Sequence, residues 1–246
     1  MKKLFLALFF LLNVVYAENI KVAVAANMAT AIEEIKEEFL KENRDDSIEF
    51  IIGSSGKLAA QIAQNAPYSL FLSADMDTPQ KLYEQKLALS EPKVYAKGAL
   101  AMFTIKDIDL AKGIKVLEDK NIEKIAIANP KTAPYGKASL EAFKNAKIDV
   151  EKKLVYGESI TQTLQFATTA SDMAIVALSS MKDEKMKKYI EGKNWVKVDN
   201  SLYNPINQGV VITKIGEKSD LTKRFYEFLF SQKAKEIFVK YGYVLE

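Results

Sequence analysis

Short apolar runs alternate with amphipathic segments of helical period along this chain, and this alternation restricts the fold more than any other feature. The first pair is typical: residues 19–26 (NIKVAVAA) suit a buried strand, and residues 28–42 then place Ile32, Ile35 and Phe39 on one helical face. This order predicts an α/β architecture with mostly parallel strands and right-handed crossovers. Further strands are expected at 47–52, 70–72, 99–105, 124–128, 154–156, 173–178 and 209–213, and further helices at 55–65, 79–85, 135–145, 161–169 and in two C-terminal segments.

The first 17 residues differ from the rest and have the pattern of an export signal. Lys2 and Lys3 precede an apolar run at residues 4–12, and residues 15–17 (VYA) match a small-x-small cleavage site. The run is too short to span a bilayer, and the chain has no cysteine that could carry a lipid anchor. We therefore expect a soluble protein that is exported by a cleaved signal peptide. The alternative is a buried N-terminal helix or an uncleaved anchor.

Two residue types are missing, and their absence narrows the chemistry. The chain has neither cysteine nor histidine, which excludes a Ser-His-Asp triad, a cysteine nucleophile, a His/Cys zinc site and any disulfide. Its 35 basic and 32 acidic residues give a formal net charge of +3, which is too weak to indicate a nucleic-acid-binding surface.

Four loops that join a strand to a helix carry the candidate binding groups. In α/β sheets ligands bind beyond the carboxyl ends of strands, where helices begin. A helix N-terminus offers unpaired amides and a partial positive charge, so several that point at one place form a site for an anion. For each loop taken alone, simple helix capping is the alternative. The loops are 25–28 (AANM), 53–57 (GSSGK), 129–137 (NPKTAPYGK) and 157–161 (GESIT).

Three short patterns suggest other chemistry, and each is weak. Ser54 and Lys57 match the S-x-x-K motif of penicillin-binding proteins, but the accompanying motifs are incomplete and in the wrong order, so a serine hydrolase is a remote alternative. Leu58 stands where a Walker A motif needs Ser or Thr. Asp75 and Asp77 are expected to cap the following helix instead of holding a metal. We therefore expect no enzymatic activity.

Four segments match a known family closely enough to name it. They are VAVAANMATAIEEI from residue 22, GSSGKLAAQI from residue 53, SLFLSAD from residue 69 and AKEIFVKYGY from residue 234. With these segments the chain resembles the periplasmic molybdate-binding proteins of ABC transporters (ModA type). The resemblance implies a class II periplasmic-binding-protein fold, with two α/β lobes joined by crossover strands near 94–104 and 205–213. Lobe I is then expected at 18–95 plus 210–246, and lobe II at 96–209.

The resemblance also implies the residues that bind the oxoanion. The family's ligand positions fall on Asn27, on Ser55 through its hydroxyl and amide, and on Tyr135 and Ile160 through their amides. Many members carry a further ligand tyrosine where this chain has Ala177, so we hypothesise that the Tyr135 hydroxyl replaces the missing one. The alternative is that Tyr135 points to solvent and binds only through its amide.

The implied function is high-affinity binding of molybdate, with tungstate bound comparably, for delivery to a permease in the inner membrane. No cofactor is implied, because molybdenum stays an oxoanion held by N–H and O–H donors, without direct metal–ligand bonds to the protein. Glu158, a carboxylate beside the site, is expected to point away and cap its helix. We expect a monomer. The alternative within the class is a receptor for sulfate or another tetrahedral oxoanion.

Overall fold

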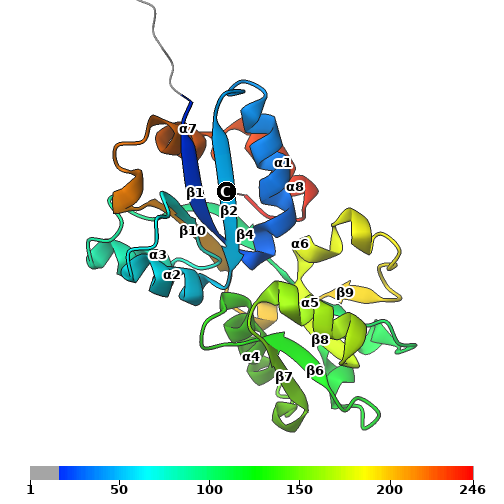
Figure 1. Cartoon of the computed structure of the whole chain (residues 1–246). Coiled ribbons are helices and arrows are strands. Elements are labelled where there is room, and N and C mark those ends of the chain that lie inside the picture. The colour runs from blue at the N-terminus through cyan, green and yellow to red at the C-terminus, as the bar shows by residue number, and fades with distance from the viewer. Residues whose placement is uncertain (1–16, 246) are drawn as a thin grey trace, which may run out of the picture.

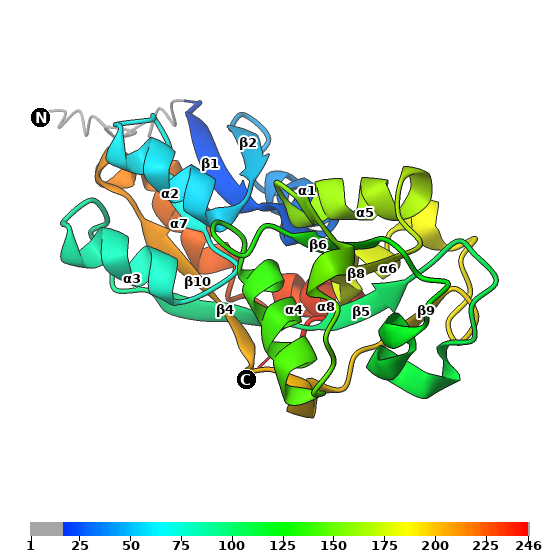
Figure 2. The same ribbon diagram turned by 90° about the horizontal axis from the view of Figure 1, so that it is seen from below.

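The computed structural model describes residues 17–245, so the predicted signal peptide lies outside the described residues except for its last position. Two five-stranded sheets, each flanked by helices, form two lobes that lie next to each other (Figures 1 and 2). None of the helices between residues 17 and 245 combines the length and the apolar character that crossing a membrane requires.

The first sheet has the strand order β2-β1-β3-β10-β4 and belongs to lobe I. Its first three strands run parallel, whereas β10 is antiparallel to both β3 and β4. The strands are β1 (Asn19–Ala25), β2 (Ser47–Gly53), β3 (Leu70–Leu72), β4 (Lys93–Gly98) and β10 (Ile206–Ile212).

The second sheet has the order β7-β6-β8-β5-β9 and belongs to lobe II. Strands β7, β6 and β8 are parallel, and β5 is antiparallel to both of its neighbours. The strands are β5 (Leu100–Phe103), β6 (Ile125–Ala128), β7 (Leu154–Gly157), β8 (Met173–Ala177) and β9 (Trp195–Lys197).

Helices cover both faces of each sheet, which explains why the strands read as continuous apolar runs. In β1, Val22 and Val24 pack with the helices of one face, while Ala23 packs with Leu58 and Phe71 on the other. The helices of lobe I are α1 (Ala29–Leu40), α2 (Ser55–Ala63), α3 (Asp77–Glu84), α7 (Asp220–Phe228) and α8 (Gln232–Lys240). Those of lobe II are α4 (Pro134–Asn145), α5 (Ile160–Thr169) and α6 (Leu178–Met181). Shorter 3-10 turns are η1 (Ala26–Met28), η2 (Leu110–Glu118), η3 (Glu151–Lys153), η4 (Glu184–Met186), η5 (Asn200–Leu202) and η6 (Lys214–Gly216).

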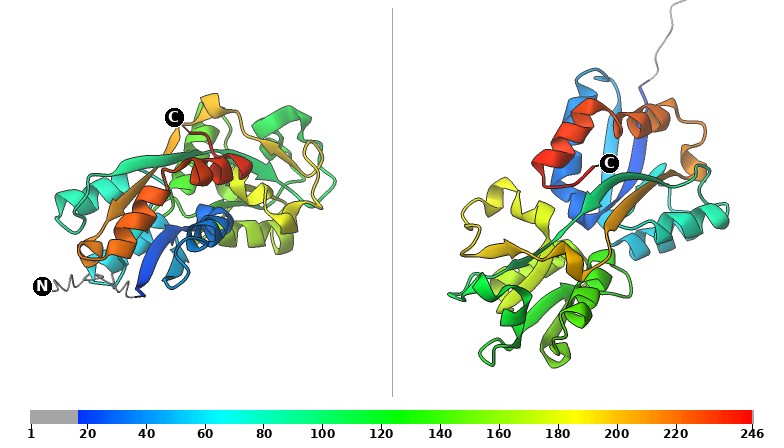
Figure 3. Two further views of the ribbon diagram at one scale, coloured as in Figure 1. Left: turned by 90° about the horizontal axis from the view of Figure 1, so that it is seen from above. Right: turned by 180° about the vertical axis from the view of Figure 1, so that it is seen from behind.

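The chain passes between the sheets twice, side by side (Figure 3). The first passage leads from the end of β4 at Gly98 to the start of β5 at Leu100, and the second occupies residues 198–205 between β9 and β10. The two passages are bonded to each other: Val198 N–H donates to Leu100 O at 3.0 Å, and Leu100 N–H donates to the Tyr203 hydroxyl at 3.0 Å. The lobe boundaries expected at 95/96 and 209/210 stay a prediction.

The expectation of mostly parallel strands is wrong, because four of the eight strand pairings are antiparallel. The cause is the double crossover. Strands β5 and β10 follow the two passages directly and enter their new sheet against the direction of its βα units. The sequence pattern also gave no indication of β9, which has only three residues, or of η2, whose helical course is interrupted at Gly113 with φ 57°.

Candidate functional site

Four helical N-termini, two from each lobe, meet at one small cavity between the lobes. They are the starts of η1 and α2 in lobe I and of α4 and α5 in lobe II. The cavity wall contains all four residues expected from the sequence, Asn27, Ser55, Tyr135 and Ile160, and each is at most 5% exposed. The structure therefore brings the predicted residues together, although they are up to 133 positions apart in the chain.

The cavity is small and uncharged. Its volume is about 10 Å³, far below the roughly 300–1,000 Å³ of pockets that hold organic ligands. Apart from the four expected residues its wall consists of small groups, and no charged side chain of residues 17–245 belongs to it. These other residues are Ala25, Ala26, Ser54, Ala74, Ala133 and Pro134. A site of this size and composition suits a small ion that hydrogen-bond donors recognise.

The N-terminal amides are available because the first turn of a helix has no intrahelical acceptors for them. In α4 the residue at the N-terminus is Pro134, which has no N–H, so Tyr135 supplies the first amide. In α5 the Ser159 side chain caps by accepting from Gln162 N–H at 3.2 Å, which leaves the Ile160 amide uncapped by that serine. Amides from both lobes can thus point to one ligand.

The Ser55 hydroxyl is also placed to donate. Its oxygen accepts the N–H of Ala74 at 2.9 Å, so its own proton is free for a ligand. The preceding residue, Ser54, is the N-cap of α2 but makes no capping bond. Its hydroxyl is buried and finds no partner among the described residues. Two serine hydroxyls therefore border the cavity at the start of α2.

Tyr135 is buried, so the alternative in which it points to solvent is wrong. Its side chain is 2% exposed, and its hydroxyl accepts a hydrogen bond from Gln208 Nε2 at 3.2 Å. Burial raises the pKa of this phenol well above its ordinary value, so it stays neutral. Whether the hydroxyl also touches the ligand stays a prediction.

Glu158 does not cap its helix, contrary to expectation, because Ser159 does. The Glu158 carboxylate instead lies 2.5 Å from Lys57 Nζ, and Lys57 belongs to the opposite lobe. The ion pair neutralises the carboxylate near the anion cavity. It also removes the partner that a Ser54–Lys57 dyad would need, because the lysine amine is engaged elsewhere. The serine-hydrolase alternative is therefore not favoured.

Asp75 has the predicted capping role. Its carboxylate accepts the backbone N–H and the hydroxyl of Thr78, both at 3.0 Å, at the start of α3. Within residues 17–245 there is no group of three carboxylates, histidines or cysteines that could hold a metal ion.

The two lobes are closed on each other. The N–H of Gly56 donates to Thr132 O at 2.9 Å, and the Thr30 hydroxyl donates to Asp183 Oδ2 at 2.7 Å. The Thr161 hydroxyl also reaches across, to a backbone oxygen of η1 at 3.2 Å. With the ion pair at Glu158, these bonds surround the cavity and keep the N-termini of both lobes within reach of one small ligand.

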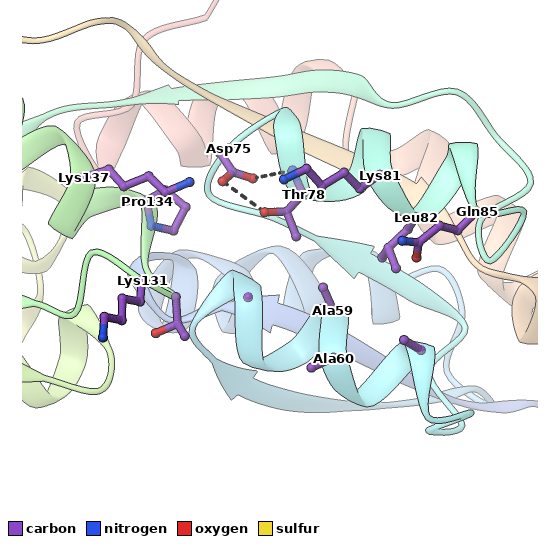
Figure 4. A pocket seen from close by; sticks show the side chains of 13 residues that line it. Ala59, Ala60, Asp75, Thr78, Lys81, Leu82, Gln85, Lys131, Pro134 and Lys137 are labelled. Atoms are coloured by element: carbon purple, nitrogen blue, oxygen red, sulfur yellow. Dashed lines mark hydrogen bonds between the residues drawn. The ribbon is translucent and has the colours of Figure 1, made fainter.

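A larger groove of about 310 Å³ lies next to the cavity. Figure 4 shows Lys81 of α3 on its lobe I side and Lys131 and Lys137 reaching it from lobe II. These lysines give the groove a basic wall. They do not line the cavity itself.

The sequence pattern missed a polar cluster directly behind the cavity. Gln208 of β10 is completely buried, and its Oε1 accepts from Asn27 Nδ2 and from the Tyr95 hydroxyl, each at 2.9 Å. The Tyr243 hydroxyl donates to Asn27 O at 2.8 Å. The available signal was a glutamine inside the apolar run INQGVVI at 206–212, since a polar residue in a buried strand needs a partner.

Comparisons with known proteins agree with this geometry. The model of the family "Bacterial extracellular solute-binding protein" matches residues 20–244. The molybdate-binding protein ModA of Rhodobacter capsulatus is 35% identical over 94% of this chain and 90% of its own length. ModA of Azotobacter vinelandii is 34% identical over 94% and 91%. The solved structure of the Azotobacter vinelandii periplasmic molybdate-binding protein superimposes with a TM-score of 0.85 at 30% identity, covering 92% of this chain and 99% of that one.

Proposed function

Because the chain belongs to the bacterial extracellular solute-binding proteins, and within them to the ModA group, we propose that it binds molybdate with high affinity for delivery to an ABC transporter permease. The protein acts as a receptor and does no chemistry on the ion. It works in the periplasm as a monomer after removal of the signal peptide.

The observation that carries the proposal is the convergence of four helical N-termini on one uncharged cavity. Hydrogen bonds to a charged group contribute about 1.5–3 kcal/mol each. Roughly six of them, after the losses from ordering, supply the ~8–12 kcal/mol of micromolar to nanomolar binding. Backbone amides and the Ser55 hydroxyl can provide such a set without any cationic side chain.

The same cavity explains selectivity for the kind of anion. Donors alone suit a tetrahedral ion that is fully ionised, whereas a protonated phosphate would leave one O–H without an acceptor. The cavity radius then separates sulfate from the larger molybdate. Tungstate matches molybdate closely in size and charge, so we infer that it binds comparably.

The closed conformation of the two lobes is the feature that a permease can recognise. The bonds from Gly56 to Thr132 and from Thr30 to Asp183 form only when the lobes meet. A ligand that contacts both lobes stabilises this state, and a ligand with no preference between states would not. We infer that residues around the mouth of the cleft contact the permease.

Isothermal titration calorimetry with molybdate, tungstate, sulfate, phosphate and chromate tests the proposal. We expect molybdate and tungstate to bind with nanomolar to micromolar dissociation constants and phosphate not to bind. Ser55→Ala should weaken binding, whereas Ser201→Ala, at an exposed serine remote from the cavity, should not. At a hundredfold excess over its dissociation constant, the ligand should stabilise the protein by about 2.7 kcal/mol in a thermal-shift assay. Tighter binding of sulfate than of molybdate would favour the sulfate alternative.

A further inference from the structure

Gln208 connects both lobes to the cavity through its side-chain amide. Its Oε1 accepts from Asn27 Nδ2 of lobe I, and its Nε2 donates to the Tyr135 hydroxyl of lobe II at 3.2 Å. Tyr95 of β4 completes the set, with its hydroxyl 2.9 Å from the same Oε1. All these groups are buried. A residue of the crossover strand β10 thus touches two of the residues that line the cavity.

The fold makes room for this contact in a specific way. A Cβ atom at Gly98 would lie 2.1 Å from the Tyr135 hydroxyl and 2.6 Å from Gln208 Nε2. Both distances are far below van der Waals contact, so only glycine at position 98 permits the pair. Burial of a glutamine amide is costly unless its groups are hydrogen-bonded. The space left by Gly98 and the hydrogen bonds at both polar atoms of the amide indicate that these contacts keep Gln208 in the buried strand.

With the hydrogen bonds in these directions, one buried polar atom has no donor. With Asn27 Nδ2 donating to Gln208 and to the Tyr243 hydroxyl, Asn27 Oδ1 is buried without a partner among the described residues. A buried acceptor without a donor is rare in proteins. It lies on a residue of the anion cavity, where a carbonyl oxygen would repel the ligand.

A second arrangement of the same atoms removes this conflict. If both amides rotate by half a turn, Gln208 Nε2 donates to Asn27 and to the Tyr95 hydroxyl, which itself donates to Ser73 O at 3.1 Å. The Tyr135 hydroxyl then donates to Gln208 Oε1. The Tyr243 hydroxyl turns its proton from Asn27 O to Asn27 Oδ1, and Asn27 O keeps the Ser179 hydroxyl as its donor at 2.9 Å. Every member of the cluster then keeps a partner, and Asn27 Nδ2 takes the place of the orphaned oxygen. Only an acceptor supplied from outside the cluster completes this arrangement.

We propose that Gln208 is the positioning residue of the oxoanion site: its side chain orients the Asn27 amide toward the ligand and ties that amide to Tyr135 across the two lobes. The inference rests on the proposed function and deepens it. An anion in the cavity selects the arrangement in which Asn27 presents N–H groups. Tyr135 then gives its proton to Gln208, so its hydroxyl acts behind the ligand and does not contact it.

A double-mutant cycle in molybdate binding tests this role. The variants are Gln208→Leu, Asn27→Ala and the pair of both, and Asn207→Leu is the control because Asn207 is the neighbouring residue of β10 and lies outside the cavity wall. We expect Gln208→Leu to weaken binding about tenfold, as outer partners of binding groups do. In the Asn27→Ala background the same substitution should have little further effect, because Gln208 acts through Asn27.

A purely structural role gives a different pattern. It would lower the unfolding free energy of the unliganded protein and weaken binding equally with and without the Asn27 side chain. Such additive losses, or unchanged binding by Gln208→Leu, would overturn the inference. If Gln208→Leu does not fold, Gln208→Met, which keeps the length of the side chain, is put through the same cycle. Failure of the unsubstituted protein to bind molybdate would instead refute the proposed function.

Discussion

The backbone N–H of Gly56 donates to the carbonyl oxygen of Thr132 at 2.9 Å, and this bond joins the two lobes beside Ser55. A Cβ atom at Gly56 would lie 3.0 Å from that oxygen and 3.1 Å from Thr132 Cα. The contact is therefore close enough that position 56 controls how far the lobes can shut. It gives the closed state a structural basis that can be tested directly.

Gly56→Ala should weaken molybdate binding several-fold while leaving the unliganded protein at least as stable. The added methyl group pushes against Thr132 only when the lobes are shut, and alanine is favoured over glycine in a helix by about 1 kcal/mol. Calorimetry gives the affinity, and small-angle X-ray scattering with molybdate gives the degree of closure. Ala60→Val on the same helix is the control. Unchanged affinity would show that this contact does not limit closure.

The ion pair between Lys57 and Glu158 should have a modest effect on molybdate affinity, and the loss should differ according to which of the two residues is replaced. Both side chains are substantially exposed, and exposed pairs contribute about 0.2–1 kcal/mol, or up to roughly fivefold in affinity. Lys57→Met should weaken binding more than Glu158→Gln, because it leaves a bare carboxylate near the anion. Titrations at low and high salt should show the difference shrink as salt rises. A larger loss in Glu158→Gln would contradict this account.

The lysines of the groove should affect the association rate of molybdate more than its equilibrium dissociation constant. Lys131 and Lys137 border the path to the cavity but not the cavity itself. Replacing both by Met should slow association with molybdate at low ionic strength, and the difference should vanish near 1 M salt. Stopped-flow fluorescence measures the rate, with Lys193→Met as the remote control. An equal loss at all salt concentrations would mean that these lysines contact the bound ion.

The tyrosines behind the cavity predict how stability depends on pH. Burial raises the pKa of both Tyr95 and Tyr135 well above the ordinary value of 10. The unfolded chain therefore loses these protons first, so their contribution to stability is complete below pH 10 and decreases as the pH rises further. Each such tyrosine should cost about 1.4 kcal/mol per pH unit in that range.

Urea unfolding between pH 8 and pH 11.5 measures this slope, and Tyr95→Phe should make it shallower. Molybdate affinity, in contrast, should be constant from pH 6 to pH 9, because no charged or histidine side chain lines the cavity within the described residues. A slope that Tyr95→Phe leaves unchanged, or an affinity that titrates near neutrality, would be inconsistent with a neutral cluster.

Tyr135→Phe separates two roles of the phenol. If the hydroxyl works through Gln208, the substitution weakens binding in the natural background but has little effect once Gln208 is leucine. If the hydroxyl touches the ligand, the loss is the same in both backgrounds. Calorimetry on the four proteins measures the difference, and unchanged binding by the single variant would exclude both roles.

Much of this fold could be predicted from the sequence because the βα units carry local signals. The periodicity of Ile32, Ile35 and Phe39 places α1 correctly, and all three side chains are buried. The antiparallel course of β5 and β10 was not predictable in this way, since strand direction depends on where the chain crosses between lobes. The direction of these two strands is determined only by the topology of the complete fold.

In the candidate site, too, local features could be predicted from the sequence and long-range contacts could not. Asn27, Ser55, Tyr135 and Ile160 stand at helix starts, a position that local sequence reveals, and they line one cavity. The pairing of Glu158 with Lys57 and the cluster around Gln208 were missed. Their partners lie 73 to 216 residues apart, and no local pattern records such a contact.

The most direct test of the central claim is a crystal structure with molybdate, in which the anomalous scattering of molybdenum locates the ion. The account predicts one strong peak between the lobes, with oxygens of the ion accepting hydrogen bonds from the amides of Ser55, Tyr135 and Ile160 and from the side chain of Asn27. A molybdenum peak in the lysine groove instead, or a cavity without molybdenum at saturating concentration, would contradict it.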